Sequence, residues 1–499
     1  MSLSSLPKAH RAALLGAVAV ISATGLGVHV LHPAQAQTPP ALMAPAAPAS
    51  FANIVERVRG AVVAVKVKTL ETAEADDDNQ MPFPQMRPGD PLERFFRRFG
   101  GEGGVPFGRQ QRPRSGQALG SGFIISEDGY VVTNHHVVEH ASEVSITLDD
   151  GRNVSAEVVG ADQRTDLALL KIKDKGPFTS VAFAREMPRV GDWVIAVGNP
   201  FGLGGTVTAG IVSARGRDIG AGPYDDFLQI DASVNRGNSG GPTFNTRGEV
   251  VGVNTAIFSP SGGSVGIGFA IPTEVARDVV DSLRNKGSVA RGWIGVQIQG
   301  VTKDIAESLG AKEAKGALVS DLQAGSPAGA AGLRAGDIIV AVDGERIEGP
   351  RELARKIASF GPEKQIDLTY LRDGREQHAH VKLGALPPEN PRRAERGGGN
   401  GNPERNALTG LGLTLAPASA VAGAGREGVV VAEVDPDGVA SQMGLKAGDV
   451  ILEAGGQKVE RPSDVSLALS NARKEGRRAV LLRVKTGDNT RFIALAPAG

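Results

Sequence analysis

Three residues whose types can cooperate in nucleophilic catalysis lie in separate parts of this chain. His136 follows a strand-like apolar run, Asp166 heads another such run, and Ser239 lies in a glycine-rich turn. A serine hydroxyl is a weak nucleophile near neutral pH and needs a base within hydrogen-bonding reach. Histidine suits that role because its unperturbed pKa of about 6.5 lets it take up and return a proton. An aspartate can fix the imidazole tautomer and stabilise its charged form. The order His, Asp, Ser therefore predicts a base, an orienting acid and a nucleophile.

The glycines around Ser239 fit a second requirement of acyl transfer. Glycine adopts backbone angles that residues with a Cβ resist, which lets N–H groups approach a substrate carbonyl. We expect the N–H groups of Gly237 and Ser239 to stabilise the oxyanion. Taken singly, each residue has a commoner role: a serine between glycines is usually a turn, a strand-end aspartate a cap, and a buried histidine a core residue. Only their combination in one β-rich stretch indicates catalysis.

The surrounding sequence predicts an all-β domain that brings these segments together. From 120 to 272, short apolar runs alternate with Gly, Asn and Asp turns, which is typical of a barrel or sandwich. Residues 273–286 then carry a helical period. Residues 71–117 interrupt the pattern with acidic, Pro-rich and Gly-rich pieces and a basic-aromatic cluster at 94–99. Long loops inside compact domains are usually functional or disordered, and we expect this one to be regulatory and to contact another subunit.

The C-terminal part of the chain contains an internal repeat. The segment GLRAGDII at 332–339 recurs as GLKAGDVI at 444–451, and a short glycine-bearing apolar segment precedes each copy, at 294–296 and 411–413. This self-similarity predicts two copies of one domain of about ninety residues. A stretch rich in Pro, Arg, Gly and Asn separates the copies and is typical of a flexible linker.

Length and composition agree with several β-rich domains. A chain of 499 residues is longer than a single hydrophobic core can organise, so about three domains are expected. With Gly 67, Pro 30 and only 4% aromatics, the chain suits short strands and tight turns. Lys+Arg 55 balance Asp+Glu 55, so no overall field favours nucleic acid or an anionic membrane. Cysteine is absent, which excludes a cysteine nucleophile, thiolate metal sites and disulfides.

The N-terminus predicts export. Basic residues including Lys8 and Arg11 precede an uncharged apolar stretch from Ala12 to Leu31, and a small-x-small pattern ends at Ala36. This arrangement is typical of a signal peptide cut after Ala36, so we expect a periplasmic protein. The apolar stretch approaches the ~20 residues that span a bilayer, so an uncleaved anchor stays open as the alternative.

The three catalytic segments resemble those of chymotrypsin-fold proteases, and the whole chain resembles the HtrA/DegP (protease Do) family. The family pattern Thr-Asn-x-His-Val-Val matches residues 133–138 and selects His136, and its Asp-Leu-Ala-Leu and Gly-Asn-Ser-Gly-Gly patterns match at 166–169 and 237–241. The resemblance covers residues 53 to 497. It implies two six-stranded barrels followed by two PDZ domains, in an ATP-independent serine endopeptidase that degrades unfolded or damaged exported proteins. It also implies chaperone activity and a homo-oligomer, a trimer that can assemble into larger cages, and it implies no metal or organic cofactor.

Substrate preference follows from the residues expected around the S1 pocket. Ser233 stands six residues before Ser239 and Val234 follows it, so no acid is present to bind a basic P1 side chain. We therefore expect a small or aliphatic P1 residue. Asn238 stands where trypsin-like enzymes carry the aspartate that pairs with a new N-terminus, so the resemblance implies activation by ordering of loops instead. The expected pocket residues are Ser233, Val234, Phe269, Ala270 and Ile271, and the expected switching loops are 214–226, 234–238 and 257–265.

In both PDZ-like copies, the expected function is peptide binding by strand addition. A peptide adds as a strand, and its carboxylate meets backbone N–H groups of a glycine-bearing loop. We expect the first copy to bind exposed C-termini or unfolded segments and leave the second open, since a copy can also serve as a spacer or subunit contact. The expected loops comprise Trp293, Ile294, Gly295 and Val296 in the first copy, and Gly410, Leu411, Gly412 and Leu413 in the second.

Two other functions compete with proteolysis. The pattern His136-Val-Val-Glu139-His140 matches that of inverted zinc peptidases, whose histidines share one helix face, but the preceding residues favour strand and turn. The pair His378 and His380 also has metal-binding spacing, although an exposed sheet face is the commoner case. A non-proteolytic holdase or PDZ scaffold for exported proteins would use the same repeats, and only the intact triad favours the enzyme.

These predictions divide the chain as follows. The fold class is mainly β, a chymotrypsin-like double β-barrel protease domain followed by two α+β PDZ domains. The expected boundaries are 1–36 signal peptide, 37–52 flexible lead, 53–290 protease domain with the regulatory loop 71–117, 291–386 first PDZ domain, 387–405 linker and 406–497 second PDZ domain.

Overall fold

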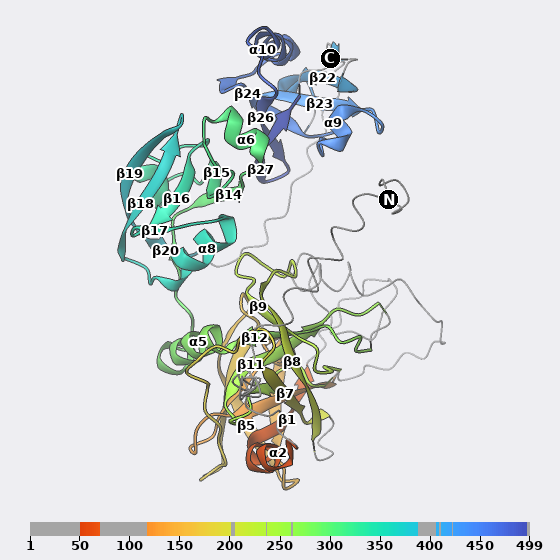
Figure 1. Cartoon of the computed structure of the whole chain (residues 1–499), viewed down its shortest axis with the longest axis vertical. Coiled ribbons are helices and arrows are strands. Elements are labelled where there is room, and N and C mark those ends of the chain that lie inside the picture. The colour runs from red at the N-terminus through yellow and green to blue at the C-terminus, as the bar shows by residue number, and fades with distance from the viewer. Residues whose placement is uncertain are drawn as a thin grey trace, which may run out of the picture. The chain divides into compact units, whose positions relative to one another are not determined.

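The structure is a computed structural model, shown in Figure 1. It describes residues 50–69, 117–200, 205–235, 237–260, 263–387, 406–408, 411–421 and 423–496. The expected signal peptide, nearly all of the loop 71–117 with its aromatic cluster, and nearly all of the linker 387–405 lie outside the described residues. In the described part of the chain, none of the helices combines the length and the apolar character needed to cross a bilayer.

The first β-barrel follows a short helix, α2 (Ala52–Val58), and a 3-10 turn, η2 (Arg59–Ala61). Its strands close in the order β1-β2-β3-β6-β5-β4. Alternate residues of β1, among them Val63 and Val65, point into the barrel and pack against Val131 and Leu170. The short helix α4 (His135–Val138) lies between β3 and β4. The strands are β1 (Val62–Thr69), β2 (Gln117–Ile124), β3 (Tyr130–Thr133), β4 (Ala141–Thr147), β5 (Asn153–Asp162) and β6 (Leu167–Ile172).

The second barrel closes in the order β10-β11-β12-β9-β8-β7 and continues into helix α5 (Thr273–Lys286). One apolar cluster joins the barrels, with Phe123 and Leu169 from the first, Ile195 and Phe244 from the second, and Leu283 from α5. The predicted double barrel is confirmed, and α5 has the bounds that its period predicted. The strands are β7 (Trp193–Gly198), β8 (Thr206–Arg217), β9 (Phe227–Ile230), β10 (Pro242–Phe244), β11 (Val250–Ile257) and β12 (Gly268–Pro272).

The first repeat forms a sheet of order β14-β15-β16-β18-β19, with β17 beside β16 and a separate pair of β13 and β20. Helices α7 and α8 contribute to its core together with the sheet. Its elements are β13 (Gly292–Trp293), β14 (Val296–Gly300), α6 (Lys303–Ser308), β15 (Ala317–Leu322), α7 (Pro327–Ala330), β16 (Ile338–Val342), β17 (Glu345–Arg346), α8 (Pro350–Ser359), β18 (Gln365–Arg372), β19 (Arg375–Lys382) and β20 (Gly384–Ala385).

The second repeat has the order β21-β22-β23-β24-β26-β27, with β25 beside β24. Helix α10 covers one face of its sheet through Val465 and Leu469. Its elements are β21 (Asn406–Leu408), β22 (Leu413–Pro417), η5 (Ala418–Ala420), β23 (Val429–Val434), α9 (Val439–Gln442), β24 (Val450–Ala454), β25 (Gln457–Lys458), α10 (Pro462–Lys474), β26 (Val480–Thr486) and β27 (Asn489–Leu495).

The repeated motif has the same structural role in both copies. Asp337 accepts a hydrogen bond from the Arg334 N–H at 2.7 Å and binds the Arg372 guanidinium. In the second copy, Asp449 accepts one from the Lys446 N–H at 3.0 Å and another from the Thr486 hydroxyl. Both carboxylates are buried, so each closes its turn and anchors a neighbouring strand.

Two glutamines of β14 connect the repeats. The Gln299 side-chain amide pairs with both the N–H and the C=O of Phe492 on β27. The Gln297 amide donates to the Asp488 C=O and accepts from the Thr490 N–H. These contacts satisfy backbone groups of an edge strand that would otherwise be free to pair with another chain.

Candidate active site

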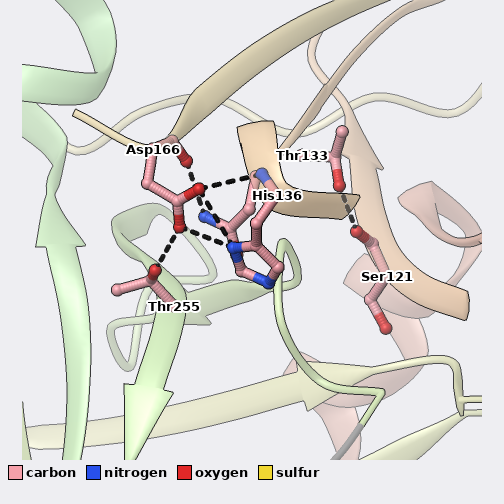
Figure 2. A network of polar contacts seen from close by, with 6 residues as sticks. Ser121, Thr133, His136, Asp166 and Thr255 are labelled. Atoms are coloured by element: carbon pink, nitrogen blue, oxygen red, sulfur yellow. Dashed lines mark hydrogen bonds and ion pairs between the residues drawn. The ribbon is translucent and has the colours of Figure 1, made fainter. Parts of the chain in front are cut away.

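The predicted base and the predicted orienting acid are in direct contact. The Nδ1 atom of His136 lies 2.8 Å from Oδ2 and 3.0 Å from Oδ1 of Asp166, as Figure 2 shows. The backbone N–H of His136 also donates to Oδ1 of the same carboxylate, at 3.0 Å. This arrangement fixes the ring and keeps the proton on Nδ1, where it is donated to the carboxylate, so that Nε2 carries the lone pair that a base needs.

Asp166 is held in place by groups around it. It adopts a left-handed backbone conformation with φ 55°, which an aspartate tolerates better than most residues. Its C=O accepts hydrogen bonds from the Asn134 side chain at 2.9 Å and the His135 N–H at 3.1 Å, and its carboxylate accepts one from the Thr255 hydroxyl. Burial alone would raise the pKa of Asp166, but the charge and hydrogen bonds of His136 and the Thr255 hydroxyl hold it below its usual range. The carboxylate therefore stays ionised in a buried site.

Ser121, a buried residue of β2, connects the serine turn to the histidine segment. Its N–H donates to the C=O of Ser239 at 2.8 Å, and its hydroxyl donates to the C=O of Gly237 at 2.5 Å. Its own C=O accepts a hydrogen bond from the Thr133 hydroxyl, at the end of the strand that leads into His136. The backbone of Ser239 is thereby fixed beside the segment that carries the imidazole.

The glycine after the serine allows this close approach. Gly240 has φ 84°, and a Cβ at this position would lie 2.2 Å from the C=O of Ser121 and 2.3 Å from the hydroxyl of Thr133. No side chain fits there, so the requirement for glycine is steric as well as conformational.

The expected oxyanion donors lie in the same turn. Gly237 has φ 92°, and its preceding residue, 236, lies outside the described residues. Within the part of the chain that is described, the Ser239 N–H donates no backbone hydrogen bond. An N–H that donates no hydrogen bond within the backbone can donate one to the oxygen of a substrate carbonyl.

The expected S1 residues have different surroundings in the structure. Val234 belongs to the core cluster of the second barrel, and a Cβ on the neighbouring Gly268 would lie 3.1 Å from it. Phe269, in β12, instead packs with Ile219 of the loop between β8 and β9, in a small separate cluster. The C=O of Ser233 accepts the Thr208 hydroxyl, while Ala270 and Ile271 are buried in β12.

A buried ion pair supports the segment that delivers Asp166. The guanidinium of Arg291 binds both carboxylate oxygens of Asp162, at 2.7 and 2.5 Å, and each side chain is only 8% exposed. The Thr165 hydroxyl donates to the same carboxylate, and the Arg291 guanidinium lies 5.2 Å from the Tyr224 ring centroid. Burial raises the pKa of Asp162, but Arg291 outweighs it and holds that pKa below its usual range.

Sequence reasoning missed Ser121, Thr255 and Arg291. Thr255 is only 2% exposed and follows a buried asparagine in β11, a strand that is otherwise apolar except for one glycine. Buried polar residues in such a strand need hydrogen-bond partners. The polar pair in an otherwise apolar run is therefore the sequence feature that points to Thr255. Nothing local marks Arg291, since its partner is 129 residues away in sequence.

The zinc-peptidase alternative does not fit the structure. Helix α4 ends at Val138, and Glu139 has the extended backbone angles φ −59° and ψ 135°. His136 and His140 therefore share no helix face, and Nδ1 of His136 is bound to Asp166. The described residues contain no group of three or more His, Cys, Asp or Glu side chains placed to hold a metal. His378 and His380 lie on the exposed face of β19.

The expected peptide loops have matching backbones in the two repeats. Gly295 and Gly412 have φ 73° and 68°, and the C=O of each accepts an N–H at 2.9 and 2.8 Å, from Gln323 and Asp435 respectively. In the first copy, Trp293 belongs to β13, Ile294 is buried and Val296 begins β14. In the second copy, Leu411 and Leu413 are buried, and Gly410 lies outside the described residues.

Family models recognise the same three parts. Residues 120–253 match a trypsin-like peptidase domain, and residues 292–383 and 430–483 match PDZ domains. Together with the double barrel and the His–Asp pair, these matches define a serine endopeptidase of the chymotrypsin class that carries two PDZ domains.

Full-length relatives narrow the class. A probable periplasmic serine endoprotease DegP-like from Brucella suis is 50% identical over 500 residues, covering 97% of this chain and 95% of that protein. A protein of the same name from Rhizobium meliloti is 49% identical over 509 residues, covering 96% and 97%. A solved structure of the HtrA-type protease AlgW with decapeptide is 37% identical, with a TM-score of 0.55, covering 68% of this chain and 100% of that one. The chain belongs to the HtrA/DegP family of serine endopeptidases.

Proposed function

We propose that this protein cleaves unfolded or damaged exported proteins in the periplasm without ATP, with His136 as base, Asp166 as orienting acid and Ser239 as nucleophile. The observation that supports this most directly is the two-oxygen contact of the Asp166 carboxylate with His136 Nδ1, beside the turn that holds Ser239. The imidazole takes the serine proton through Nε2 as the hydroxyl attacks the substrate carbonyl. It then returns that proton to the leaving amine, and water repeats the sequence to release the acyl group.

Further parts of the site take defined roles in this proposal. The N–H groups of Gly237 and Ser239 stabilise the oxyanion. Ser233, Val234, Phe269, Ala270 and Ile271 shape an S1 pocket without an acid, so small or aliphatic P1 residues are preferred. The first PDZ domain binds extended peptides by strand addition at β14, which has a free edge among the described residues. A homo-oligomer with chaperone activity completes the proposal.

The test compares Ser239→Ala with the wild-type chain on unfolded casein. We expect cleavage to fall to background in Ser239→Ala while casein binding persists. Ser282→Ala, a matched change on α5, should cleave like wild type. Equal cleavage by Ser239→Ala would refute the assignment, and loss of cleavage in both variants would point to a folding defect. A peptide series that varies only P1 among Val, Ala, Ile, Lys and Phe tests the pocket, and faster cleavage after Lys would refute the aliphatic preference.

A further inference from the structure

The two PDZ domains differ at the strand edge where a peptide would add. In the first, β14 lies at the end of its sheet and has β15 as its only strand partner within the described residues. In the second, the corresponding strand β22 is flanked on both sides, by β23 and by the three-residue strand β21. The chain's own residues therefore occupy the second edge.

Strand β21 lies where a bound peptide would lie. It runs antiparallel to β22, with Leu408 opposite Leu413, Ala407 opposite Thr414 and Asn406 opposite Leu415. It also contacts helix α10, which forms the other wall of the groove. A peptide that adds to a PDZ domain is likewise antiparallel to this strand and lies between it and the helix.

Leu408 takes the place of a peptide's last side chain. It is the residue of β21 closest in sequence to the glycine-bearing loop, and it packs against the core cluster that contains Leu413, Val465 and Leu469. An aliphatic C-terminal residue would use the same apolar surface. The segment thus pairs with the backbone edge of β22 and covers part of the apolar surface beside it.

The first PDZ domain cannot close in this way because the residues before its loop are held elsewhere. Arg291 is bound to Asp162, the Gly292 N–H donates to the C=O of Phe360 at 2.7 Å, and Trp293 pairs with Gly384. The corresponding residues of the second domain follow the long linker 387–405 and can fold back onto β22.

We propose that residues 406–408 are a tethered ligand of the second PDZ domain, which keeps its groove closed to peptide C-termini until β21 is displaced. This inference rests on the proposed peptide binding by PDZ grooves. Because only residues 409–412 connect β21 to β22, the effective concentration of the tether is on the order of millimolar. A competing peptide binds with its affinity reduced by the fraction of molecules in which the groove is open.

The test uses full-length Ser239→Ala protein and a peptide ending in leucine with a photo-crosslinking residue at its penultimate position. Mass spectrometry then assigns the cross-links to the first PDZ domain (291–386) or the second (406–497). With intact β21, we expect cross-links in the first domain alone. Leu408→Glu puts a charge against an apolar core and should release β21, which raises the cross-link yield in the second domain at least tenfold. Leu467→Glu makes the same change at an exposed position of α10, where the side chain is 59% exposed, and should leave the pattern unchanged.

The outcomes separate this inference from the proposed function. If neither domain cross-links in any variant, peptide binding itself fails. If the first domain cross-links and the second does so equally with β21 intact, the groove is open and the inference is wrong. It is also wrong if Leu408→Glu adds no cross-links in the second domain while that domain keeps the amide-exchange protection of the Leu467→Glu control.

A second variant tests closure without loosening the fold. The chain has no cysteine, so Ala407→Cys with Thr414→Cys creates a single pair at directly opposed positions. We expect this pair to form a disulfide under mild oxidation, and the oxidised protein should bind peptide at the first domain like the reduced protein. A pair that stays reduced, while the domain remains folded, would show that β21 does not lie on β22.

Discussion

Asp225 lies in the loop between β8 and β9, and its ionisation should weaken the folded protease domain as pH rises. Its buried carboxylate accepts hydrogen bonds from the N–H groups of Ile219 and Ala221, at 3.0 and 2.9 Å. Burial raises the pKa of Asp225 to about 6, the two N–H groups oppose this, and the neighbouring Asp218 adds to it. Asp218 is itself bound to Arg351, and the next residue along, Asp226, is bound to Arg355.

The size and the sign of this effect on stability follow from the pKa of Asp225 in the unfolded chain and in the folded protein. Moving the pKa of a carboxyl from 3.8 to about 6 corresponds to roughly 3 kcal/mol. Since the folded protein holds the proton more tightly than the unfolded chain, the contribution to stability is fully present below pH 3.8 and is lost as pH rises through about 6. Asn in this position keeps an acceptor oxygen and carries no charge. Asp225→Asn should therefore equal wild type near pH 4 and exceed it by up to about 3 kcal/mol at pH 8.

Calorimetry at a series of pH values from 4 to 8 measures this, in a Ser239→Ala background that prevents self-digestion. For a domain of this size, 1 kcal/mol shifts Tm by roughly 2–4 °C, so a gain of about 3 kcal/mol should raise the protease transition of Asp225→Asn by about 6–12 °C at pH 8. Asp192→Asn, at an exposed carboxyl whose pKa hydrogen bonding to the Arg189 N–H keeps below its usual range, is the control and should not gain stability with pH. A Tm difference between Asp225→Asn and wild type that is constant across this range would refute the reasoning. So would lower stability of Asp225→Asn at pH 8.

Three further outcomes follow from single contacts. Thr255→Val removes a hydrogen bond to a buried carboxylate, which contributes about 1.5–3 kcal/mol. In steady-state kinetics on a short peptide, kcat should fall about tenfold or more with KM nearly unchanged. Arg291→Met leaves Asp162 buried without its partner and should destabilise the protease domain by about 3–5 kcal/mol, measured by its Tm, while adding Asp162→Asn should recover most of the loss. Gln299→Ala removes two hydrogen bonds to β27 and should cost about 1–3 kcal/mol, seen as faster amide exchange in β27 with proteolysis of a short peptide unchanged.

The sequence predicts the part of the site that depends on residue type and misses the part that depends on distant partners. His136, Asp166 and Ser239 stand out because few residue types can do this chemistry, and their local turns need particular neighbours. The groups that hold them, Ser121 and Thr255, are ordinary hydroxyls whose importance comes from contacts across 118 and 89 residues. Such contacts exist only once the barrels close, and no local pattern records them.

The repeat shows how equal sequence motifs permit unequal function. Asp337 and Asp449 each accept a hydrogen bond from the backbone N–H three residues earlier in their turns. The repeated motif therefore predicts a common fold but does not predict a common function. What separates the domains lies just before each glycine-bearing loop, where Arg291 is fixed to the protease domain and residues 406–408 are not. A short free segment beside an unpaired strand edge tends to pair with it, because each backbone group gains a partner. The first groove thus stays open because its preceding residues are bound elsewhere, and the second closes because they are available.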